Sequence, residues 1–574
     1  MKNTMRLTSI LIIFISFGCG PSANKDNSKT DADAIFFGGD ILTMEGSNPQ
    51  YVEAIAVKDG KIISVGTKKE IEGFQGIKTE MRDLKGKTML PGFIDSHSHL
   101  ADAMNIAGQA NLSSQPVGNC NNFSDIITSL ENCKKENNIK DGEWIIGWGY
   151  DETQLAEKRP PNKIDLDKAF PNNPVFIRHV SGHIGVANSL ALADGKIDKN
   201  TKDPNGGLIL RMPGTTEPSG VLQEMAIHHY VEKINEVFSG QKKDLLQKAL
   251  KTYIENGVTT AQEGFTDEST IAFLKQSAKD KKLSIDVVSL AGFIDMDKNL
   301  SDTTMNWGIY NDHLKFEGTK IVADGSPQGK TAFFTKPYFT EVAGCSHDCR
   351  GFSNVTQEQL NNMFEVAYKN KNQLFVHCNG DATMDMLIKA HELACEKTNQ
   401  PLDADRRTVI IHSNFVRLDQ LQKYKEYNLL PSFFTNHAYF WGDVHVENLG
   451  ESRAFFLSPI KTADSLGIIY SNHTDNIITP INQIFTIWSA VNRISRSGKI
   501  IGPNEKATAY QALKAITINA AYFYFEETRK GSLKIDKLAD FVILDKNPLK
   551  VDAITIKDIK VMETIKEGVS IYNR

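Results

Sequence analysis

The stretch Leu90-Pro91-Gly92-Phe93-Ile94-Asp95-Ser96-His97-Ser98-His99-Leu100 decides how the rest of the chain is interpreted. A Pro-Gly turn leads into a short apolar run that ends in His-Ser-His. Alternate side chains of a strand face the same way, so the two histidines are expected to project to one side. Imidazole binds zinc and its first-row neighbours. A lone His-x-His pair is more often an ordinary histidine pair, so the interpretation depends on strand ends elsewhere in the chain.

Apolar segments alternate with helical ones from residue 90 onward. The predicted strands are 92–99, 257–263, 284–291, 319–325, 373–378, 408–413, 429–434 and 467–475. Helical runs at 243–255, 358–370, 382–396 and 418–427 separate many of them. Eight strand-then-helix units predict an α/β fold of the TIM type, a (β/α)8 barrel.

Short strands near both chain ends predict a second, all-β part. Residues 33–90 contain brief apolar runs, with Asp59-Gly60 as a hairpin signal between two of them, and residues 526–574 have the same character. Strands from both ends are therefore expected to pair in one small β-sandwich beside a barrel at 91–525. Residues 101–240 do not fit the barrel rhythm, and we expect an inserted substrate-pocket subdomain there.

The N-terminus has the pattern of an export signal. A positively charged start is followed by the apolar run 7–17, which is too short to span a bilayer comfortably. Cys19 follows a glycine, as in the lipobox of bacterial lipoproteins, although Ser16 stands where an aliphatic residue is more usual. We expect residues 1–19 to be a lipoprotein signal peptide and 20–32 a flexible tether. The protein would then be an exported bacterial lipoprotein, anchored to a membrane through lipidated Cys19 and facing the periplasm or the cell exterior. A plain signal peptide with a chance cysteine is the alternative.

Composition argues against nucleic acid as a partner and limits the roles that the cysteines can have. The 574 residues carry a formal net charge of -5, and no basic tract with interleaved aromatic residues argues for nucleic acid. Six of the seven cysteines follow Cys19, and none forms a Cys-x-x-Cys pair. In an oxidising compartment Cys120–Cys133 and Cys345–Cys349 are candidate disulfides, with free thiols as the alternative. Cys378 and Cys395 are expected to be small core residues.

Residues able to bind a metal fall at the ends of the predicted barrel strands. The active site of a TIM barrel forms at the C-terminal ends of its strands. His97 and His99 end strand one, strand four carries Lys320 and Asp324, and strands five, six and eight end in His377, His412 and Asp475. The chain has 14 histidines, and four of them lie at the ends of strands one, five and six. A metal site predicts this placement, and ordinary structural histidines do not.

These motifs resemble the amidohydrolase superfamily, and specifically its subgroup related to N-substituted formamide deformylases. The resemblance covers nearly the whole mature chain. It rests on Pro91-Gly92-Phe93-Ile94-Asp95-Ser96-His97-Ser98-His99, Gly182-His183-Ile184-Gly185-Val186-Ala187-Asn188-Ser189, Lys320-Ile321-Val322-Ala323-Asp324-Gly325-Ser326, His377-Cys378-Asn379-Gly380-Asp381, Ile411-His412, Asp475, Gly531-Ser532-Leu533 and Lys537-Leu538-Ala539-Asp540. In that family the terminal strands form a β-sandwich beside the barrel.

The resemblance implies a divalent metal, zinc before others, as one or two ions. The metal-site residues it implies are His97, His99, Lys320, His377, His412 and Asp475. Lys320 stands where several relatives have a carboxylated lysine. An ammonium group cannot bind a cation, whereas the carbamate that lysine forms with carbon dioxide can. The alternative is an unmodified lysine beside a single metal.

This ligand set predicts hydrolysis by metal-activated water. Asp475 would take a proton from the attacking water and pass it to the leaving nitrogen. The oxyanion needs a further donor, with His437 as the first candidate and His183 as the second; structural histidines are the alternative for both. Relatives often have Ser-Asp with a proline two positions on. Here Asn472-His473-Thr474-Asp475 stands instead, so His473 is either a bystander or a partner of a ligand.

The expected function is hydrolysis of carbon–nitrogen bonds other than peptide bonds (class EC 3.5) in a small N-substituted amide or formamide. Ester or lactone hydrolysis, deamination or isomerisation at the same metal site is the alternative, and a non-catalytic binding lipoprotein is the alternative from another class. Asp324, Trp148 and Tyr150 are the candidate substrate-binding residues. Turn formation competes for Asp324 and core packing for the two aromatic residues. A homodimer is one assembly that the sequence allows.

Overall fold

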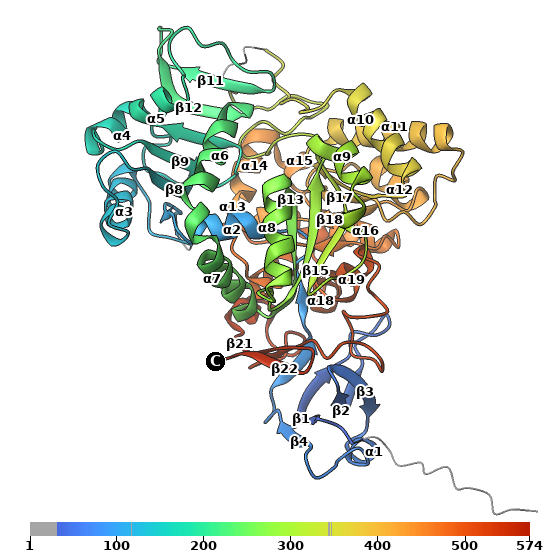
Figure 1. Cartoon of the computed structure of the whole chain (residues 1–574). Helices are drawn as coiled ribbons and strands as arrows, with labels where there is room; N and C mark the ends of the chain where they lie inside the picture. Colours follow the sequence, from blue (N-terminus) through green and yellow to red (C-terminus); the bar gives the residue numbers. More distant parts are fainter. Residues whose placement is uncertain (1–30, 116, 343–344, 346) are drawn as a thin grey trace, which may run out of the picture.

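The computed structural model describes residues 31–115, 117–342, 345 and 347–574. The predicted signal peptide, Cys19 and the tether up to residue 30 lie outside these residues. Across the described ranges, no helix combines the length and apolar character needed to cross a membrane. Three sheets organise this part of the chain (Figure 1).

Eight parallel strands form the central sheet, and they follow one another in chain order. They are β6 (Phe93–Ile94), β13 (Val258–Thr266), β14 (Asp286–Gly292), β15 (Leu314–Val322), β16 (Gln373–Cys378), β17 (Val409–His412), β18 (Leu430–Phe433) and β19 (Ser471–Asn472). Every residue of β14, β16, β17 and β18 is buried, as expected for parallel strands covered on both faces. The eight predicted strands are present, and the fold is TIM-like.

Helices between the strands and after the last one cover the outside of the curled sheet (Figure 1). They include α7 (Lys242–Glu255), α8 (Glu268–Lys279), α10 (Gln357–Lys369), α11 (Asp381–Thr398), α12 (Leu418–Glu426), α16 (Ile460–Ser465), α17 (Gln483–Asn492), α18 (Ala509–Ala515) and α19 (Ile518–Phe523). Capping boxes fix some of their starts: Thr356 caps α10 with Gln359, and Thr508 caps α18 with Gln511. The four helical runs predicted from sequence match α7, α10, α11 and α12 within about two residues.

The ends of the central sheet meet without a strand ladder between them. Ser98 and Asn476 form an isolated parallel bridge, and the Ser96 hydroxyl donates to Ser471 Oγ at 2.8 Å. Asp95, just after β6, accepts a hydrogen bond from the Thr474 amide at 3.2 Å and one from the Thr474 hydroxyl. The first and last strands are thus joined by side chains and loops.

Strands one, four and eight differ most from the prediction. Strand eight covers only Ser471–Asn472 instead of 467–475, so Asp475 lies in the loop after it. Strand one ends at Ile94, so His97 and His99 lie in the following loop instead of in a strand. The loop is held by polar contacts to the far end of the sheet, and these replace the strand ladder. Strand four begins at Leu314 and ends at Val322. Asp324 therefore lies beyond the strand.

Strands from both chain ends share a second sheet. Its order is β22-β21-β20-β5-β1-β2-β3, with β4 paired to β1. The strands are β1 (Ala34–Leu42), β2 (Tyr51–Lys58), β3 (Lys61–Gly66), β4 (Glu80–Asp83), β5 (Thr88–Pro91), β20 (Phe541–Leu544), β21 (Val561–Lys566) and β22 (Val569–Asn573). Asp59 and Gly60 connect β2 to β3 with φ of 47° and 72°, as a two-residue hairpin turn requires. The pairing of β5 with β20 joins the two ends; that this sheet forms a sandwich stays a prediction.

A third sheet lies entirely between β6 and β13 in sequence. Its order is β11-β12-β10-β9-β8-β7. The strands are β7 (Ala110–Asn111), β8 (Ile145–Tyr150), β9 (Val175–His179), β10 (Ile184–Ala187), β11 (Gly207–Arg211) and β12 (Pro218–Glu224), with α2 (Leu100–Ile106), α3 (Phe123–Glu136), α4 (Lys163–Ala169), α5 (Ser189–Asp194) and α6 (His228–Val237) around them. This inserted sheet has its own apolar core. In Figure 1 it lies on the opposite side of the barrel from the terminal sheet.

Of the two candidate disulfides, one is formed and the other is not. Cys345 and Cys349 form a disulfide. Cys120 and Cys133 are free and buried, so a disulfide between them is wrong: the Cys120 sulfur lies 3.2 Å from Ser129 Oγ instead. Cys378 and Cys395 are free and buried, as predicted for core residues.

Candidate metal centre

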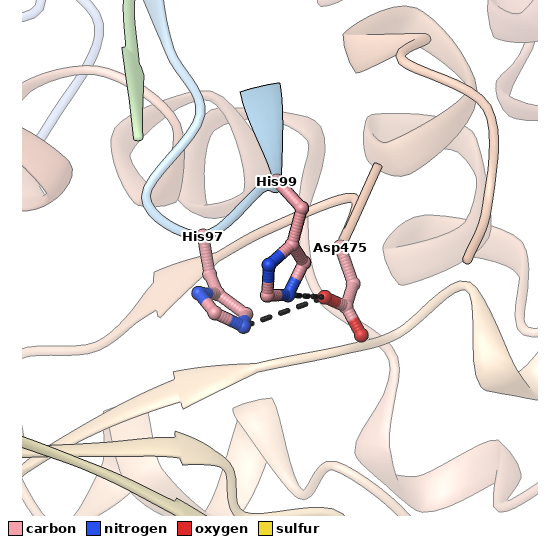
Figure 2. A group of neighbouring side chains, drawn as sticks. All are labelled: His97, His99 and Asp475. Atoms are coloured by element: carbon pink, nitrogen blue, oxygen red, sulfur yellow. Dashed lines mark ion pairs between the residues drawn. The ribbon is translucent and has the colours of Figure 1, made fainter. Parts of the chain in front are cut away.

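Two histidines and an aspartate meet where the curled sheet closes (Figure 2). Oδ1 of Asp475 lies 3.4 Å from Nε2 of His97 and 3.3 Å from Nε2 of His99. Backbone hydrogen bonds join the same loops: the Asp475 amide donates to the His97 carbonyl at 3.0 Å, and the His99 amide donates to the Asn476 carbonyl at 2.6 Å. The loops after β6 and β19 thus hold these side chains together.

Three more strands bring polar side chains to the same place. Lys320 lies near the end of β15, and its Nζ is 3.2 Å from Nε2 of His97. Nδ1 of His377 in β16 and Nε2 of His412 at the end of β17 face each other at 3.0 Å. The latter atom is 4.0 Å from Oδ2 of Asp475. The structure therefore brings the six predicted metal-site residues into one cluster.

Burial decides the charge state of this cluster. Burial, and then the nearby Lys320 cation, lowers the pKa of His97 and of His377 well below the ordinary value for histidine. Burial and then His377 do the same to the pKa of His412. These rings are neutral at ordinary pH, which is the form that binds metals. Burial by itself would raise the pKa of Asp475, but the contact with His99 lowers it, so the carboxylate is charged.

A glutamine on the neighbouring strand orients His97. The amide nitrogen of Gln262, in β13, donates to the Ser96 carbonyl at 2.9 Å and to the Tyr524 hydroxyl oxygen at 2.7 Å. Its Oε1 therefore faces Nδ1 of His97, at 2.6 Å. Since that oxygen only accepts, Nδ1 carries the proton and Nε2 presents a lone pair toward Asp475 and Lys320.

His473 orients His412 in a similar way. Nδ1 of His473 is 2.7 Å from the Ser432 hydroxyl oxygen, and its Nε2 is 3.1 Å from Nδ1 of His412. Burial lowers the pKa of His473 to about 3, so this ring is also neutral. Of the two alternatives from sequence, the structure places His473 as a partner of a predicted ligand.

The donor set suits a divalent cation. Oδ1 of Asp475 is buried and accepts no hydrogen bond of normal geometry from the described residues. A buried oxygen without a donor costs free energy unless something else satisfies it. His412 and Asp475 also adopt φ of 72° and 51°, a conformation that persists mainly where a functional site requires it. Neutral imidazoles and one carboxylate are the ligands that zinc and similar metals take.

The two predicted oxyanion donors differ in position. The ring of His183 lies 5.8 Å from that of His377, and its Nδ1 is 2.8 Å from Oε2 of Glu224. Burial lowers the pKa of His183, but Glu224 outweighs this and raises it. Nδ1 of His437 instead lies 3.0 Å from Nε2 of His445, and burial holds the pKa of His437 well below its usual value.

The three predicted substrate residues have different surroundings. Asp324 is fully buried, and its carboxylate accepts hydrogen bonds from the amides of residues 333, 379 and 380 and from the Thr383 hydroxyl. These donors lie 9 to 59 residues away, so Asp324 joins the loop after β15 to the loop after β16, and its turn-forming and substrate-binding roles both stay predictions. The Trp148 ring borders a cavity beside the metal cluster. Tyr150 packs in the core of the inserted sheet, with its ring 5.2 Å from that of His179.

Sequence analysis did not single out Gln262 or its neighbour Glu263, which accepts a hydrogen bond from the Ala101 amide at 2.5 Å. Burial raises the pKa of Glu263 to about 7. A signal was present, because Gln-Glu ends predicted strand two at the same edge as the ligands. The partner of His183, Glu224, has no comparable signal, because it lies 41 residues away in the insertion.

Solved structures share this architecture. An uncharacterised metal-dependent hydrolase from Pyrococcus horikoshii is 24% identical, with a TM-score of 0.69 over 91% of this chain and 99% of that one. A second uncharacterised metal-dependent hydrolase, from Pyrococcus furiosus, is 23% identical with a TM-score of 0.68 over 90% of this chain and 100% of that one. At these identities the likeness shows the fold.

Sequence relatives extend over nearly the whole chain. An N-substituted formamide deformylase from Arthrobacter pascens is 25% identical over 94% of this chain and 98% of its own. The putative amidohydrolase YtcJ of Bacillus subtilis is 26% identical over 94% and 99%, and the protein LONG AFTER FAR-RED 3 of Arabidopsis thaliana is 28% identical over 90% and 88%. The model of the amidohydrolase family matches residues 80–572, which include the whole cluster. The chain belongs to the amidohydrolase family.

Proposed function

We propose that this protein hydrolyses the C–N bond of a small N-substituted amide or formamide. The observation that carries the proposal is the convergence of buried imidazoles on one charged carboxylate whose Oδ1 accepts no hydrogen bond of normal geometry from the described residues. The N-substituted formamide deformylase among the relatives supports the substrate class. The residues proposed to hold the metal, zinc before others, are His97, His99, Lys320, His377, His412 and Asp475.

A bound divalent metal supplies Lewis acidity, which acidifies water and polarises a carbonyl oxygen. The chain's own residues then manage protons and position. Asp475 is ionised, so its carboxylate can accept the proton of an attacking water and deliver it to the departing nitrogen. Gln262 keeps the Nε2 lone pair of His97 directed inward, and His473 holds the ring of His412 in its orientation.

Lys320 is proposed to be carboxylated. Its side chain is 1% exposed, and burial lowers its pKa to about 7, which leaves much of the amine neutral near neutral pH. The neutral nitrogen forms a bond to the carbon of carbon dioxide and releases one proton, so an anionic carbamate replaces a cation. The 3.2 Å contact with His97 supports this position for a ligand. An unmodified lysine beside a single metal is the alternative, and intact-mass analysis under carbon dioxide separates the two.

His183 is the better supported donor to the oxyanion. It lies against His377, and Glu224 raises its pKa, so a proton is available on the ring. His437 remains the second candidate: its ring lies 4.5 Å from that of Phe434, which in turn lies 4.9 Å from that of His473.

Export as a lipoprotein is a separate proposal, and the N-terminal sequence alone supports it. Cys19 would carry the lipid and anchor the protein to a membrane. Replacing Cys19 by Ser should move the protein from the membrane fraction to the soluble fraction. A variant that stays in the membrane fraction would contradict lipidation at Cys19.

The function is tested with a panel of formamides, acyl amines, esters and lactones, assayed with zinc, with manganese and with chelator. We expect metal-dependent release of amine from at least one formamide or acyl amine, lost on chelation and restored by metal. Turnover of esters or lactones alone would replace the proposed reaction with the alternative one. Absence of metal-dependent C–N cleavage across the panel would refute the proposal.

A further inference from the structure

A cavity of about 440 Å³ lies between the inserted sheet and the loop after β19. Its wall includes Asn476, the residue after Asp475, and also Trp148 and Ile478. These last two residues flank Gly182: a Cβ placed there would lie 3.6 Å from Cδ1 of Ile478 and 3.9 Å from Cη2 of Trp148. Gly182 directly precedes His183, so the cavity lies beside the segments that carry Asp475 and His183, and none of the six proposed ligands lines it.

An arginine in this cavity has no anionic partner. The half-buried guanidinium of Arg496 lines the cavity, and its Nε is buried without a hydrogen-bond partner. Within the described ranges, no hydrogen bond or ion pair involves its side chain; the guanidinium lies 5.2 Å from the centre of the Phe440 ring. Its neighbour Arg493 differs, because it donates to the carbonyls of Leu457, Ser458 and Ile501. A charge withdrawn from water without a partner is costly, and a bound anion removes that cost.

The nearest acidic side chain does not supply this partner. Asp151 also lines the cavity, but Oδ1 of its carboxylate accepts hydrogen bonds from the Thr153 amide and hydroxyl, and Oδ2 accepts one from Trp441 Nε1 at 3.0 Å. Both oxygens are therefore already engaged. Arg496 and Asp151 attract each other at a distance without forming an ion pair.

The remaining wall is largely apolar and aromatic. Trp148, Phe440 and Trp441 border the cavity together with three isoleucines of the loop after β19. Such a wall suits a flat or aliphatic group, and one arginine at the wall selects an acceptor of negative charge.

We propose that this cavity binds the substituent of the amide substrate, and that Arg496 pairs with a carboxylate on it. The substrate class is an N-substituted formamide or small amide with an apolar, preferably aromatic, body that ends in a carboxylate. The inference rests on the proposed function, because it assumes that the scissile bond lies at the metal cluster. Arg496 is here a specificity-determining residue.

The test compares para-carboxybenzyl formamide with para-methylbenzyl formamide as substrates of the metal-loaded enzyme. We expect the wild type to have a kcat/KM at least tenfold higher for the carboxylate. In Arg496→Gln this ratio should fall at least tenfold, mainly through KM, and Arg496→Lys should keep part of it. Arg159→Gln, which removes a surface arginine of the insertion paired with Asp165, is the matched control and should keep the wild-type ratio. An unchanged ratio in Arg496→Gln would overturn the proposal; a misfolded variant lowers both rates and is recognised by its melting curve.

A binding measurement separates this proposal from the proposed function. The probe is para-aminomethylbenzoate, titrated by calorimetry into the metal-loaded wild type and into Arg496→Gln and Arg496→Lys. If the probe binds to the wild type and not to Arg496→Gln, the carboxylate site is supported even where neither formamide is hydrolysed. That absence of hydrolysis would contradict only the proposed deformylase reaction. Equal binding to the wild type and Arg496→Gln, or no binding to the wild type, overturns the carboxylate site and leaves the hydrolase proposal standing.

Discussion

The barrel strands carry a buried polar cluster at each end, and the two clusters differ in how their charges are met. At the carboxyl ends of the strands, buried histidines surround Asp475. At the opposite end, Asp286 begins β14 and is bound by Lys530, by Lys566 at 2.9 Å and by Nδ1 of His313 at 2.7 Å. We call this second group, with Lys315, Glu317, Glu526 and Asp540, the ionic cluster.

The difference separates stability from chemistry. In the ionic cluster each charge touches at least one of opposite sign, although Oε2 of Glu317 and both carboxylate oxygens of Glu526 accept no hydrogen bond of normal geometry from the described residues. In the metal cluster burial keeps His97 and His412 neutral, whereas for His99 the charge of Asp475 outweighs burial and raises the pKa. Oδ1 of Asp475 accepts no hydrogen bond of normal geometry from the described residues. The first cluster pairs its carboxylates with lysines, whereas the second offers imidazole and carboxylate ligands to a cation. This matches the general division of TIM barrels, with chemistry at the carboxyl ends of the strands and stability at the other.

Replacing Asp475 by Asn should have the largest effect on turnover of the changes considered. We expect turnover to fall by about 10²–10⁴-fold, because the amide cannot carry a proton, while much of the metal stays bound. Turnover and metal content of the purified variant measure this. Asp286→Asn at the other end is the control and should keep turnover at temperatures where it remains folded. Wild-type turnover in Asp475→Asn would rule out its role in proton transfer.

Replacing Lys530 by Met should break the ionic cluster. The variant leaves Asp286 and Glu526 short of a buried partner, so the free energy of unfolding should fall by about 3–5 kcal/mol. Denaturant unfolding measures the loss. Lys320→Met, which removes a buried lysine from the metal cluster, should cost much less stability while it abolishes turnover. A Lys530→Met protein as stable as the wild type would show that the pairs of the ionic cluster contribute nothing.

His473 offers a finer test of the metal cluster. Changing it to Gln removes the ring that orients His412, and we expect metal affinity or kcat to fall by about 10–100-fold. Metal titration and steady-state kinetics check this. His391→Gln is a matched control, since that buried ring bonds Tyr368 away from the cluster. Equal losses in the two variants would mean that His473 has only a structural role.

The smallest expected effect is the acid sensitivity of the ionic cluster. Burial by itself would raise the pKa of Asp286, but Lys530 and Lys566 hold it well below its ordinary value. Between the unfolded value of about 4 and that lower pKa, the unfolded chain binds more protons at this group. Its contribution to stability is therefore full above about pH 4 and is lost on further acidification, by at most about 1.4 kcal/mol per pH unit. Between pH 5 and pH 2, the free energy of unfolding should fall less steeply for Asp286→Asn than for the wild type. The same dependence on pH in both proteins would contradict this.

Most of the fold could be predicted from local patterns, and part of the site with it. The eight barrel strands and the Asp59-Gly60 hairpin follow from apolar runs and turn residues. Five of the six proposed ligands stand at predicted strand ends, whereas Lys320, near the start of predicted strand four, was named through the resemblance to the amidohydrolase superfamily. The length of β6 could not be predicted from the sequence. The loop with His97 and His99 is held by groups almost 380 residues away, such as Thr474. The orientation of His97 by Gln262 was missed for the same reason.

The sequence by itself determined the kind and order of the elements and the residue types at their ends, because periodicity, turn chemistry and the His-Ser-His spacing depend on near neighbours. Only the tertiary structure decided which buried polar groups find partners. Closure of the sheet brings Asp475 to His97 and His99, packing of the insertion against the barrel leaves Arg496 without an anion, and the terminal sheet carries Lys566 to Asp286. Those contacts join residues hundreds of positions apart. Their energies therefore depend on the closed fold and cannot be predicted from any local segment of the sequence.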